Sequence, residues 1–311
     1  MTRKILITGG AGFIGSNIAD LFLASGWDVA VLDDLSSGKR ENVPAKARFY
    51  PCDIRSAAAI EAIVTERPEA ICHHAAQIDV RRSMTDPRFD NDVNLGGLLN
   101  LMQGAVKAGS VRHVVFASSG GAMYGESSRI PTPEDEPAHP VSHYGAAKAA
   151  SELYLGVYRA SQGIPFAALR YANVYGPRQD PHGEAGVVAI FSGKLIDGKP
   201  CTIYGDGLQT RDYVFVGDVA RANLLAAEKR FDGAVNIGTG AETNVKQLQA
   251  LLARAAGSQA APEYKPGRPG EQRRSCIDPR AAKGALGWAP QVGIEEGLAR
   301  TFAWFHDRRT A

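Results

Sequence analysis

The chain has 311 residues, of which 44% are hydrophobic and 22% are charged, and its formal net charge is +2. These values describe a globular protein with a substantial core, and they give no reason to expect a nucleic acid or an anionic membrane surface as its main partner. No apolar run reaches the ~18 residues that cross a bilayer, and the chain enters a strand at once, so we expect a cytoplasmic protein without a signal peptide or membrane segment.

The residue types that most often bind metals are not grouped in this sequence. The four cysteines are scattered and match neither a zinc spacing nor a disulfide framework. His73 and His74 are adjacent on a predicted strand, so their side chains should point to opposite faces of a sheet. We therefore expect reduced cysteines and no metal site.

A glycine-rich turn follows the first predicted strand. Residues 4–8 are apolar and rich in isoleucine, and residues 13–25 are predicted to form an amphipathic helix. Gly9 would permit the tight turn, Gly12 would let the backbone approach a pyrophosphate, and Gly15 would let the helix pack closely on the strand. Because N–H groups at a helix N-terminus favour a phosphate, this context predicts a dinucleotide site rather than a glycine-rich turn without a ligand.

The second predicted strand, residues 28–32, ends at Asp33. An acidic residue at this place hydrogen-bonds the hydroxyl groups of the adenosine ribose and repels a 2′-phosphate, so NAD is favoured over NADP. Lys39 and Arg40 lie nearby and could weaken that preference, although a solvated loop is the simpler interpretation of both. The polar residues 34–39 could close over the adenosine.

Strands and helices continue to alternate through the first half of the chain. Further strands are predicted at residues 48–53, 70–76, 112–118 and 166–170, and helices at residues 56–65, 87–108 and 144–162. This alternation predicts an α/β fold with a doubly wound parallel sheet, a Rossmann fold, whose ligand lies along the carboxyl ends of the strands.

The pattern changes after about residue 175. Helices are predicted at residues 187–197, 218–229, 245–256, 280–287 and 294–307, strands at 201–204 and 234–238, a charged turn at 205–213 and a basic loop at 265–274. We expect residues 1–175 to form an NAD-binding Rossmann domain and residues 176–311 to form a smaller substrate-binding lobe that is interleaved with the core.

Three residues from two stretches are candidate catalytic groups. Tyr144 and Lys148 are four positions apart and so share one face of a predicted helix. A tyrosine pKa of ~10 is too high for a base at neutral pH, but a neighbouring ammonium and the charge of oxidised nicotinamide would lower it. Ser119, at the end of the fifth strand, could bond the same substrate hydroxyl. Together they predict a site that takes a proton from an alcohol whose carbon loses hydride.

Arginines in glycine- or proline-bearing loops are candidates for binding a diphosphate. Arg178, Arg211 and Arg268 are far apart in the sequence, and a guanidinium group can grip a diphosphate bidentately. For each arginine alone, a solvated surface charge is the alternative.

These motifs resemble the extended short-chain dehydrogenase/reductase superfamily over essentially the whole chain, and within it the bacterial and archaeal UDP-glucose 4-epimerases. The resemblance rests on Thr8-Gly-Gly-Ala-Gly-Phe-Ile-Gly15, Asp33-Asp-Leu-Ser-Ser-Gly38, Asp53-Ile54, His74-Ala-Ala-Gln77, Tyr144-Gly-Ala-Ala-Lys148, Arg170-Tyr-Ala-Asn-Val-Tyr-Gly-Pro-Arg178, Gly205-Asp-Gly-Leu-Gln-Thr-Arg-Asp212 and Arg268-Pro-Gly-Glu271.

The resemblance implies a role for each site residue. Tyr144 is the implied base, Lys148 binds the nicotinamide ribose and lowers the tyrosine pKa, and Ser119 is the matching hydroxyl, with Ser118 as the alternative. The implied cofactor-binding residues are Gly9, Gly12, Phe13, Ile14, Gly15, Asp33, Asp34, Ser37, Gly38, Asp53, Ile54, Ala75, Ala76, Gln77, Asn94, Ser118, Tyr144, Lys148 and Tyr171. The implied substrate-binding residues are Ser119, Tyr144, Asn173, Val188, Tyr204, Arg211, Arg268 and Glu271.

The implied reaction is a redox-neutral epimerisation that interconverts UDP-galactose and UDP-glucose. Tightly held NAD takes hydride from C4 of the sugar, and the 4-keto sugar turns over before hydride returns to its other face. The protein positions the substrate, while the cofactor carries the hydride chemistry. The family also implies a homodimer formed through two helices of the core sheet.

Several alternatives remain open. A 4,6-dehydratase would need an acid pair after the serine, where Gly120 and Gly121 stand, so we disfavour it. Ser275 falls where the family places a pocket-sizing residue, and its small side chain suggests that UDP-N-acetylglucosamine is also turned over. UDP-glucuronate is another possible sugar nucleotide. An NADPH-dependent reductase is disfavoured by Asp33, and a redox-sensing NAD-binding regulator would not need Tyr144 and Lys148 together with the arginines.

Overall fold

A seven-stranded parallel sheet forms the centre of the protein. The computed structural model describes residues 3–181, 186–267 and 272–310. The strands lie in the order β10-β6-β5-β4-β1-β2-β3, and all adjacent pairs are parallel. Their bounds are β1 Lys4–Thr8, β2 Asp28–Leu32, β3 Arg48–Tyr50, β4 Ala70–His73, β5 His113–Ser119, β6 Phe166–Tyr171 and β10 Gly233–Ile237. The predicted doubly wound fold is therefore confirmed, and strand order reverses at β1, where such sheets bind their ligand.

Helices cover both faces of this sheet because alternate strand residues point to opposite sides. Ile5 and Ile7 of β1 belong to one buried cluster, with α1 (Phe13–Ala24), α9 (Val216–Lys229) and α11 (Arg280–Leu286). Leu6 belongs to the other, with α2 (Ala57–Glu66), α5 (Gly97–Ala108) and α7 (His143–Gln162). Ser56 caps α2 by accepting a hydrogen bond from Ala59 N.

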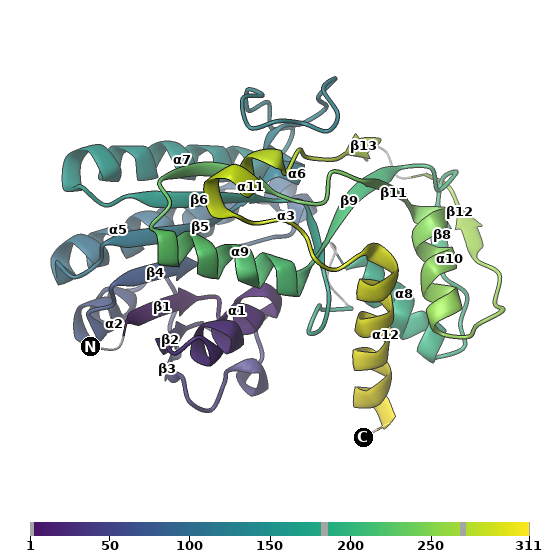
Figure 1. Cartoon of the computed structure of the whole chain (residues 1–311), viewed down its shortest axis with the longest axis horizontal. Helices are drawn as coiled ribbons and strands as arrows, with labels where there is room; N and C mark the ends of the chain where they lie inside the picture. The colour runs from purple at the N-terminus through teal and green to yellow at the C-terminus, as the bar shows by residue number, and fades with distance from the viewer. Residues whose placement is uncertain (1–2, 182–185, 268–271, 311) are drawn as a thin grey trace.

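A third buried cluster of the fold lies beyond the carboxyl ends of the strands. It is formed mainly by α8 (Val187–Ile196), α10 (Val245–Ala255) and α12 (Ile294–Thr310), with β8 (Thr202–Tyr204) and β9 (Thr210–Phe215). Figure 1 shows these elements to one side of the main sheet, with α12 ending near the C-terminus. We refer to them as the second lobe. The remaining strands are β7 Asn173–Tyr175, β11 Glu242–Asn244, β12 Glu263–Lys265 and β13 Arg274–Ser275.

Residues after 175 contribute to both parts of the molecule. β10 is the edge strand of the main sheet, and α9 and α11 cover one of its faces. The other late helices pack in the second lobe.

Two local expectations from the sequence are wrong, namely the single helix at residues 87–108 and the charged turn at residues 205–213. The helix expected at residues 87–108 is divided into α4 (Pro87–Asn91), a π-helical turn at Asp92–Gly96 and α5. The residues before it form α3 (Val80–Thr85). A short helix, α6 (Gly120–Met123), follows β5. A 3-10 turn at Arg40–Asn42 lies in the loop after β2.

The charged turn expected at residues 205–213 gives way to strand β9 at Thr210. The charged residues of this stretch suggested an exposed turn, but Asp212 is buried within β9 although it is acidic. The Asp212 carboxylate accepts hydrogen bonds from the backbone nitrogens of Thr239 and Gly240 and from the Thr239 hydroxyl, which compensate for its burial. Within the described ranges no helix is both long and apolar enough to cross a membrane.

Candidate active site

The glycine turn after β1 brings two strand ends together. Gly9 has φ +67°, and a Cβ at this position would lie 2.6 Å from the backbone nitrogen of Ala75. A Cβ at Gly15 would lie 2.2 Å from the carbonyl oxygen of Gly9. Both positions therefore require glycine, the first for its backbone conformation and the second for the close packing of α1 on the turn.

The first turn of α1 offers an anion site. The helix follows Gly12, which supplies no side-chain cap, and its N-terminal N–H groups face the turn between β1 and α1. A Cβ at Gly12 would lie 3.2 Å from the Gly9 carbonyl oxygen, so a side chain would crowd this concavity. Uncapped donors beside a backbone cradle without side chains fit the pyrophosphate of a dinucleotide. Phe13 and Ile14, at the start of the helix, also pack against the second lobe.

Asp33 is held in place at the end of β2. Its side chain is 7% exposed, its Oδ2 accepts a hydrogen bond from Ala11 N at 3.0 Å, and its Oδ1 accepts one from Leu35 N at 2.8 Å. Burial raises the pKa of this carboxyl, while the two backbone hydrogen bonds oppose the increase. Each oxygen keeps a second lone pair, so the oriented carboxylate can still accept hydrogen bonds from ribose hydroxyls.

The loop after Asp33 is fastened to the glycine turn. Lys39 N and Asn42 Nδ2 both donate to the carbonyl oxygen of Ala11. A Cβ at Gly38 would lie 2.8 Å from Asp33 Oδ1, so this glycine sits against the carboxylate. Asp34 accepts hydrogen bonds from Ser36, and Ser37 is exposed.

Asp53 and Ile54, two of the expected cofactor-binding residues, lie just before α2. Arg55 forms a salt bridge with Asp53 at 2.5 Å, which holds the pKa of that carboxyl below its usual value. Ile54 is buried, and its carbonyl oxygen accepts a hydrogen bond from Asn100 at 2.6 Å. A Cβ at Gly97 would lie 2.3 Å from the Ile54 side chain, so α5 packs directly on this residue.

The ends of β1 and β4 are joined by one hydroxyl. Thr8 Oγ1 accepts hydrogen bonds from the backbone nitrogens of His74 and Ala75, each at 3.2 Å. The neighbouring Ala76 is partly buried. Tyr171, expected at the cofactor, has its hydroxyl 2.9 Å from His74 Nε2 and 2.8 Å from Asn223 Nδ2. Its hydroxyl is thus engaged inside the protein, and its contact with a cofactor stays a prediction.

The three candidate catalytic residues come together at the carboxyl end of β5. The Ser119 side chain lies within hydrogen-bonding reach of Tyr144, where it acts to lower the pKa of the phenol. Lys148 is 4% exposed, and its ammonium donates to the carbonyl oxygen of Ala117 at 2.9 Å. The ammonium lies 4.8 Å from the ring centre of Phe116 and 5.7 Å from that of Tyr144.

Burial opposes the lowered tyrosine pKa that we expected. It raises the pKa of Tyr144 to about 12, and only the Ser119 hydrogen bond acts in the opposite direction among the main causes. In the protein alone, loss of solvent stabilisation therefore decides the direction of the tyrosine pKa, and the lowering by Lys148 and oxidised nicotinamide stays a prediction. The same burial lowers the pKa of Lys148 to about 8.

The geometry separates the two candidate serines. Ser118 Oγ donates to Glu152 Oε1 at 2.6 Å and points into the protein, whereas Ser119 bonds Tyr144. A Cβ at Gly120 would lie 3.0 Å from the Ile277 side chain, so a serine there would be crowded. Both observations favour Ser119 as the catalytic hydroxyl.

Sequence reasoning missed an ion pair behind the site. Glu152 and Arg170 form two parallel hydrogen bonds, and their side chains are only 11% and 14% exposed. Arg170 also donates to the Tyr124 hydroxyl at 2.9 Å. Glu152 lies four residues after Lys148 on the same face of α7, and this spacing is the signal that could have revealed it.

A second missed group lies beside the expected cofactor residues Gln77 and Asn94. Asn94 Nδ2 donates to the Gln77 carbonyl oxygen, and Gln77 N donates back to Asn94 Oδ1, both at 3.0 Å. Each amide side chain also donates to Asp90 Oδ1. Asn94 reaches this position from the π-helical turn, a feature often found at functional sites.

The expected substrate residues line the side that faces the second lobe. A Cβ at Gly121 would lie 3.8 Å from both Asn173 Oδ1 and Ser275 Oγ, so these three residues border one space. Val188 is buried in α8, and Tyr204 and Arg211 are half-buried in β8 and β9. Arg268 and Glu271 lie outside the described residues.

Arg178 pairs with an acidic residue of α1. Its Nη2 forms a salt bridge with Asp20 on α1 at 2.6 Å. Arg211, in contrast, donates to the Thr210 carbonyl oxygen. Arg178 is thus a weaker candidate than Arg211 for binding a diphosphate.

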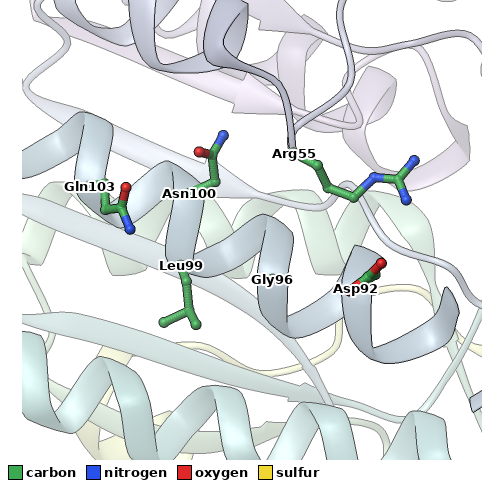
Figure 2. Close-up of a pocket in the computed structure, with 6 residues that line it drawn as sticks. All are labelled: Arg55, Asp92, Gly96, Leu99, Asn100 and Gln103. Carbon is green, nitrogen blue, oxygen red and sulfur yellow. The ribbon is translucent and has the colours of Figure 1, made fainter. Parts of the chain in front are cut away.

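A separate pocket lies on the outer side of α5, lined by Arg55, Asp92, Gly96, Leu99, Asn100 and Gln103 (Figure 2). None of these residues belongs to the expected cofactor or substrate set. In the part of the chain that the structure covers, no group of histidine, cysteine and acidic residues could hold a metal.

Comparison with known proteins agrees with this geometry. The model of the NAD dependent epimerase/dehydratase family matches residues 5–238. A UDP-glucose 4-epimerase of Mycolicibacterium smegmatis is 47% identical over 98% of this chain and 99% of the relative.

Two solved structures are similar over nearly the whole chain. The UDP-glucose 4-epimerase of Thermotoga maritima, solved with UDP-glucose, is 48% identical with a TM-score of 0.94 and covers 99% of both chains. The UDP-glucose 4-epimerase of Thermus thermophilus, solved with NAD, is 46% identical with a TM-score of 0.92 and covers 97% of this chain and 99% of its own.

Proposed function

Because this chain belongs to the NAD dependent epimerase/dehydratase family, we propose that it is a UDP-glucose 4-epimerase that interconverts UDP-galactose and UDP-glucose. The hydrogen-bonded Ser119 and Tyr144 beside buried Lys148 carry this proposal, because they form a site that can move a proton at a sugar hydroxyl. Gly120 and Gly121 supply no acid for the elimination of water that a 4,6-dehydratase performs.

The residues have separate tasks in the proposed reaction. Tyr144 takes the proton of the 4-hydroxyl, Ser119 bonds the same oxygen, and Lys148 supplies positive charge beside them. When bound, NAD supplies the hydride chemistry by accepting hydride from C4 and returning it. Asp33 and the N-terminus of α1 hold the two ends of its adenosine diphosphate. The second lobe anchors the uridine diphosphate, with Tyr204 and Arg211 among the proposed contacts.

Turnover without added cofactor tests the proposal. Purified protein is incubated with UDP-galactose, and the products are separated by chromatography. We expect UDP-glucose to form, because an epimerase regenerates its own bound NAD. Reaction of UDP-glucuronate alone would keep the mechanism and change the sugar. Inertness towards every UDP-sugar would reject the epimerase and favour a redox-sensing regulator.

A second substrate is favoured by the space between Gly121, Asn173 and Ser275. Their short side chains leave room beside the proposed sugar position, so we propose that UDP-N-acetylglucosamine is also turned over. Replacing Ser275 by tyrosine should then abolish reaction of the N-acetylated sugar and spare UDP-galactose. If UDP-N-acetylglucosamine neither reacts nor competes with UDP-galactose in the unmodified protein, this second activity is excluded.

The two serines should respond differently to removal of the hydroxyl. Ser119→Ala should lower kcat about 10- to 150-fold, since a hydrogen bond to a charged group contributes about 1.5–3 kcal/mol. Ser118→Ala should instead lower the free energy of unfolding, because it removes the buried hydrogen bond to Glu152. Turnover and denaturant unfolding of both variants check this. Slower turnover in Ser118→Ala, with lower stability in Ser119→Ala, would instead assign the catalytic hydroxyl to Ser118.

We also propose that the protein is a homodimer formed through α5 and α7. Leu153 and Val157 lie one turn apart on α7 and are 75% and 60% exposed, and Val106 on the neighbouring α5 is 42% exposed. A second copy would remove this apolar surface from water. The four cysteines are free thiols, which supports the cytoplasmic location we propose.

Introducing a charge on this surface should separate the dimer. Val157→Asp should give a monomer in size-exclusion chromatography with light scattering, because the carboxylate would be buried without a partner. Val141→Asp adds the same charge at a position that is 69% exposed outside both helices, and it should remain dimeric. A dimeric Val157→Asp would place the interface elsewhere.

A further inference from the structure

Asp90 is a completely buried carboxylate, and no cation among the described residues forms a hydrogen bond with it. Its Oδ1 accepts hydrogen bonds from Gln77 Nε2 at 2.8 Å and from Asn94 Nδ2 at 3.0 Å. Its Oδ2 is buried and has no hydrogen-bond partner among the described residues. A buried charge of this kind is costly unless a nearby charge or dipole compensates it.

Lys148 is the complementary buried cation. It is 4% exposed, and its ammonium donates to one backbone carbonyl oxygen. It lies on α7, against which α4 packs, and α4 carries Asp90. Glu152 is also close to Lys148, but Arg170 already neutralises that carboxylate through a bidentate salt bridge. Asp90 is therefore the carboxylate whose charge remains to balance Lys148.

Resting on the function proposed above, we propose that Asp90 is the counter-ion of Lys148 and acts as a positioning residue that keeps the ammonium charged beside Tyr144. Its hydrogen bonds to Gln77 and Asn94 hold the carboxylate at that place. The same bonds link the charge balance of the site to the loop after β4, which is expected to meet the cofactor.

The electrostatics of the neighbouring groups agree with this role. Burial lowers the pKa of Lys148 to about 8, while Asp90 and Glu152 oppose the decrease. Asp90 also raises the pKa of Tyr144. Burial raises the pKa of Asp90 itself, and among the opposing influences are Lys148 and the exposed His143 at the start of α7.

His73, the last residue of β4, and His74, which follows it, do not supply a positive charge that could balance the Asp90 carboxylate. Burial and Lys148 lower the pKa of His74 to about 3 and that of His73 well below its usual value, so both rings are neutral at pH 7. Negative charge near the ammonium thus comes from α4 through Asp90 and from α7 through Glu152, whereas the Tyr144 phenol is neutral.

Asp90→Asn tests the proposal with little change in shape. Asparagine keeps the accepting Oδ1 and replaces only the oxygen that has no partner. Without the negative charge, the pKa values of both Tyr144 and Lys148 should fall. The acidic and alkaline limbs of the kcat/KM profile should therefore both move to lower pH, by roughly one unit for charges several ångströms apart.

Asp92→Asn is the matched control. Asp92 is exposed and lies two residues further along the chain. Its substitution removes the same charge, so the pH profile of kcat/KM for this variant should match that of the unmodified protein. A lower rate for Asp90→Asn with both limbs unmoved would mean a merely structural role and would overturn the proposal.

A stability measurement tests the pair independently of the reaction. Lys148→Met leaves Asp90 buried without its cation, so the folded protein holds the Asp90 proton more tightly than the unfolded chain. The Tm deficit of Lys148→Met should therefore grow between pH 5 and pH 8. The double variant Asp90→Asn/Lys148→Met should recover part of that deficit.

A Tm deficit that does not depend on pH, or a double variant no more stable than Lys148→Met, would overturn the counter-ion role. Because unfolding needs no sugar nucleotide, these outcomes remain interpretable if the protein proves inactive on UDP-galactose. The inference and the proposed function can therefore fail separately.

Discussion

Tyr144→Phe is expected to lower the rate of UDP-galactose conversion about 10²–10⁴-fold, the usual contribution of a positioned general base. The substitution removes only the hydroxyl that lies within hydrogen-bonding reach of Ser119. The phenol is buried with a pKa of about 12 in the protein alone, so its proton transfer depends on the positive charges brought together around it. Product formation under single-turnover conditions measures the loss in the chemical step.

Tyr154→Phe makes the same change ten residues further along α7, where the side chain is 43% exposed. It should keep the rate of the unmodified protein. NAD released on denaturation should also be unchanged in Tyr144→Phe, which would show that cofactor binding survives. A Tyr144→Phe variant that turns over UDP-galactose at the normal rate would assign the base to another residue.

Glu152→Gln is expected to lower the free energy of unfolding by about 3–5 kcal/mol, because removing one partner of a buried pair leaves the other charge uncompensated. Arg170 is 14% exposed on its side chain and would keep its positive charge inside the protein. The loss should be largest in denaturant unfolding at neutral pH. Ser118 and the Tyr124 hydroxyl bond this pair, so the strand end that carries Ser119 would lose support as well.

Glu295→Gln is the control for this measurement. Glu295 pairs with Arg254 at 2.9 Å, but both side chains are more than half exposed, at 69% and 65%. Exposed pairs contribute at most about 1 kcal/mol, so this variant should unfold almost like the unmodified protein. Similar losses of unfolding free energy in both variants would show that the Glu152–Arg170 pair contributes no more to stability than an exposed pair does.

The parts of the site that could be predicted depend on residues close together in the chain. The turn from β1 into α1 and the acid at the end of β2 have local backbone requirements that a few residues reveal. Gly9 adopts φ +67°, and Gly15 packs against the turn itself, so each glycine is explained within its own motif. Tyr144 and Lys148 share a helix face because of their spacing alone.

The errors have a common physical origin in tertiary contacts. The charge of Asp212 suggested a turn, but Thr239 and Gly240, from a distant loop, make a buried strand possible. The π-helical turn interrupts a sequence that otherwise reads as one helix, and it places Asn94 against Gln77. The pKa of Tyr144 was predicted from the charges of Lys148 and oxidised nicotinamide, whereas burial by the fold raises it in the protein alone.

By itself, the sequence determined the parallel α/β fold, and it predicted the turn for the cofactor and the residues proposed to exchange a proton with a sugar hydroxyl. These depend on hydrophobic periodicity, glycine geometry and short spacings, which act within one or two elements. Only the tertiary structure decided which serine meets Tyr144 and that Glu152 is neutralised by Arg170. It also placed Asp90 in the interior with one carboxylate oxygen that has no hydrogen-bond partner among the described residues. Hydrogen bonding and desolvation depend on which distant segments enclose a group, and spacing along the chain does not specify that.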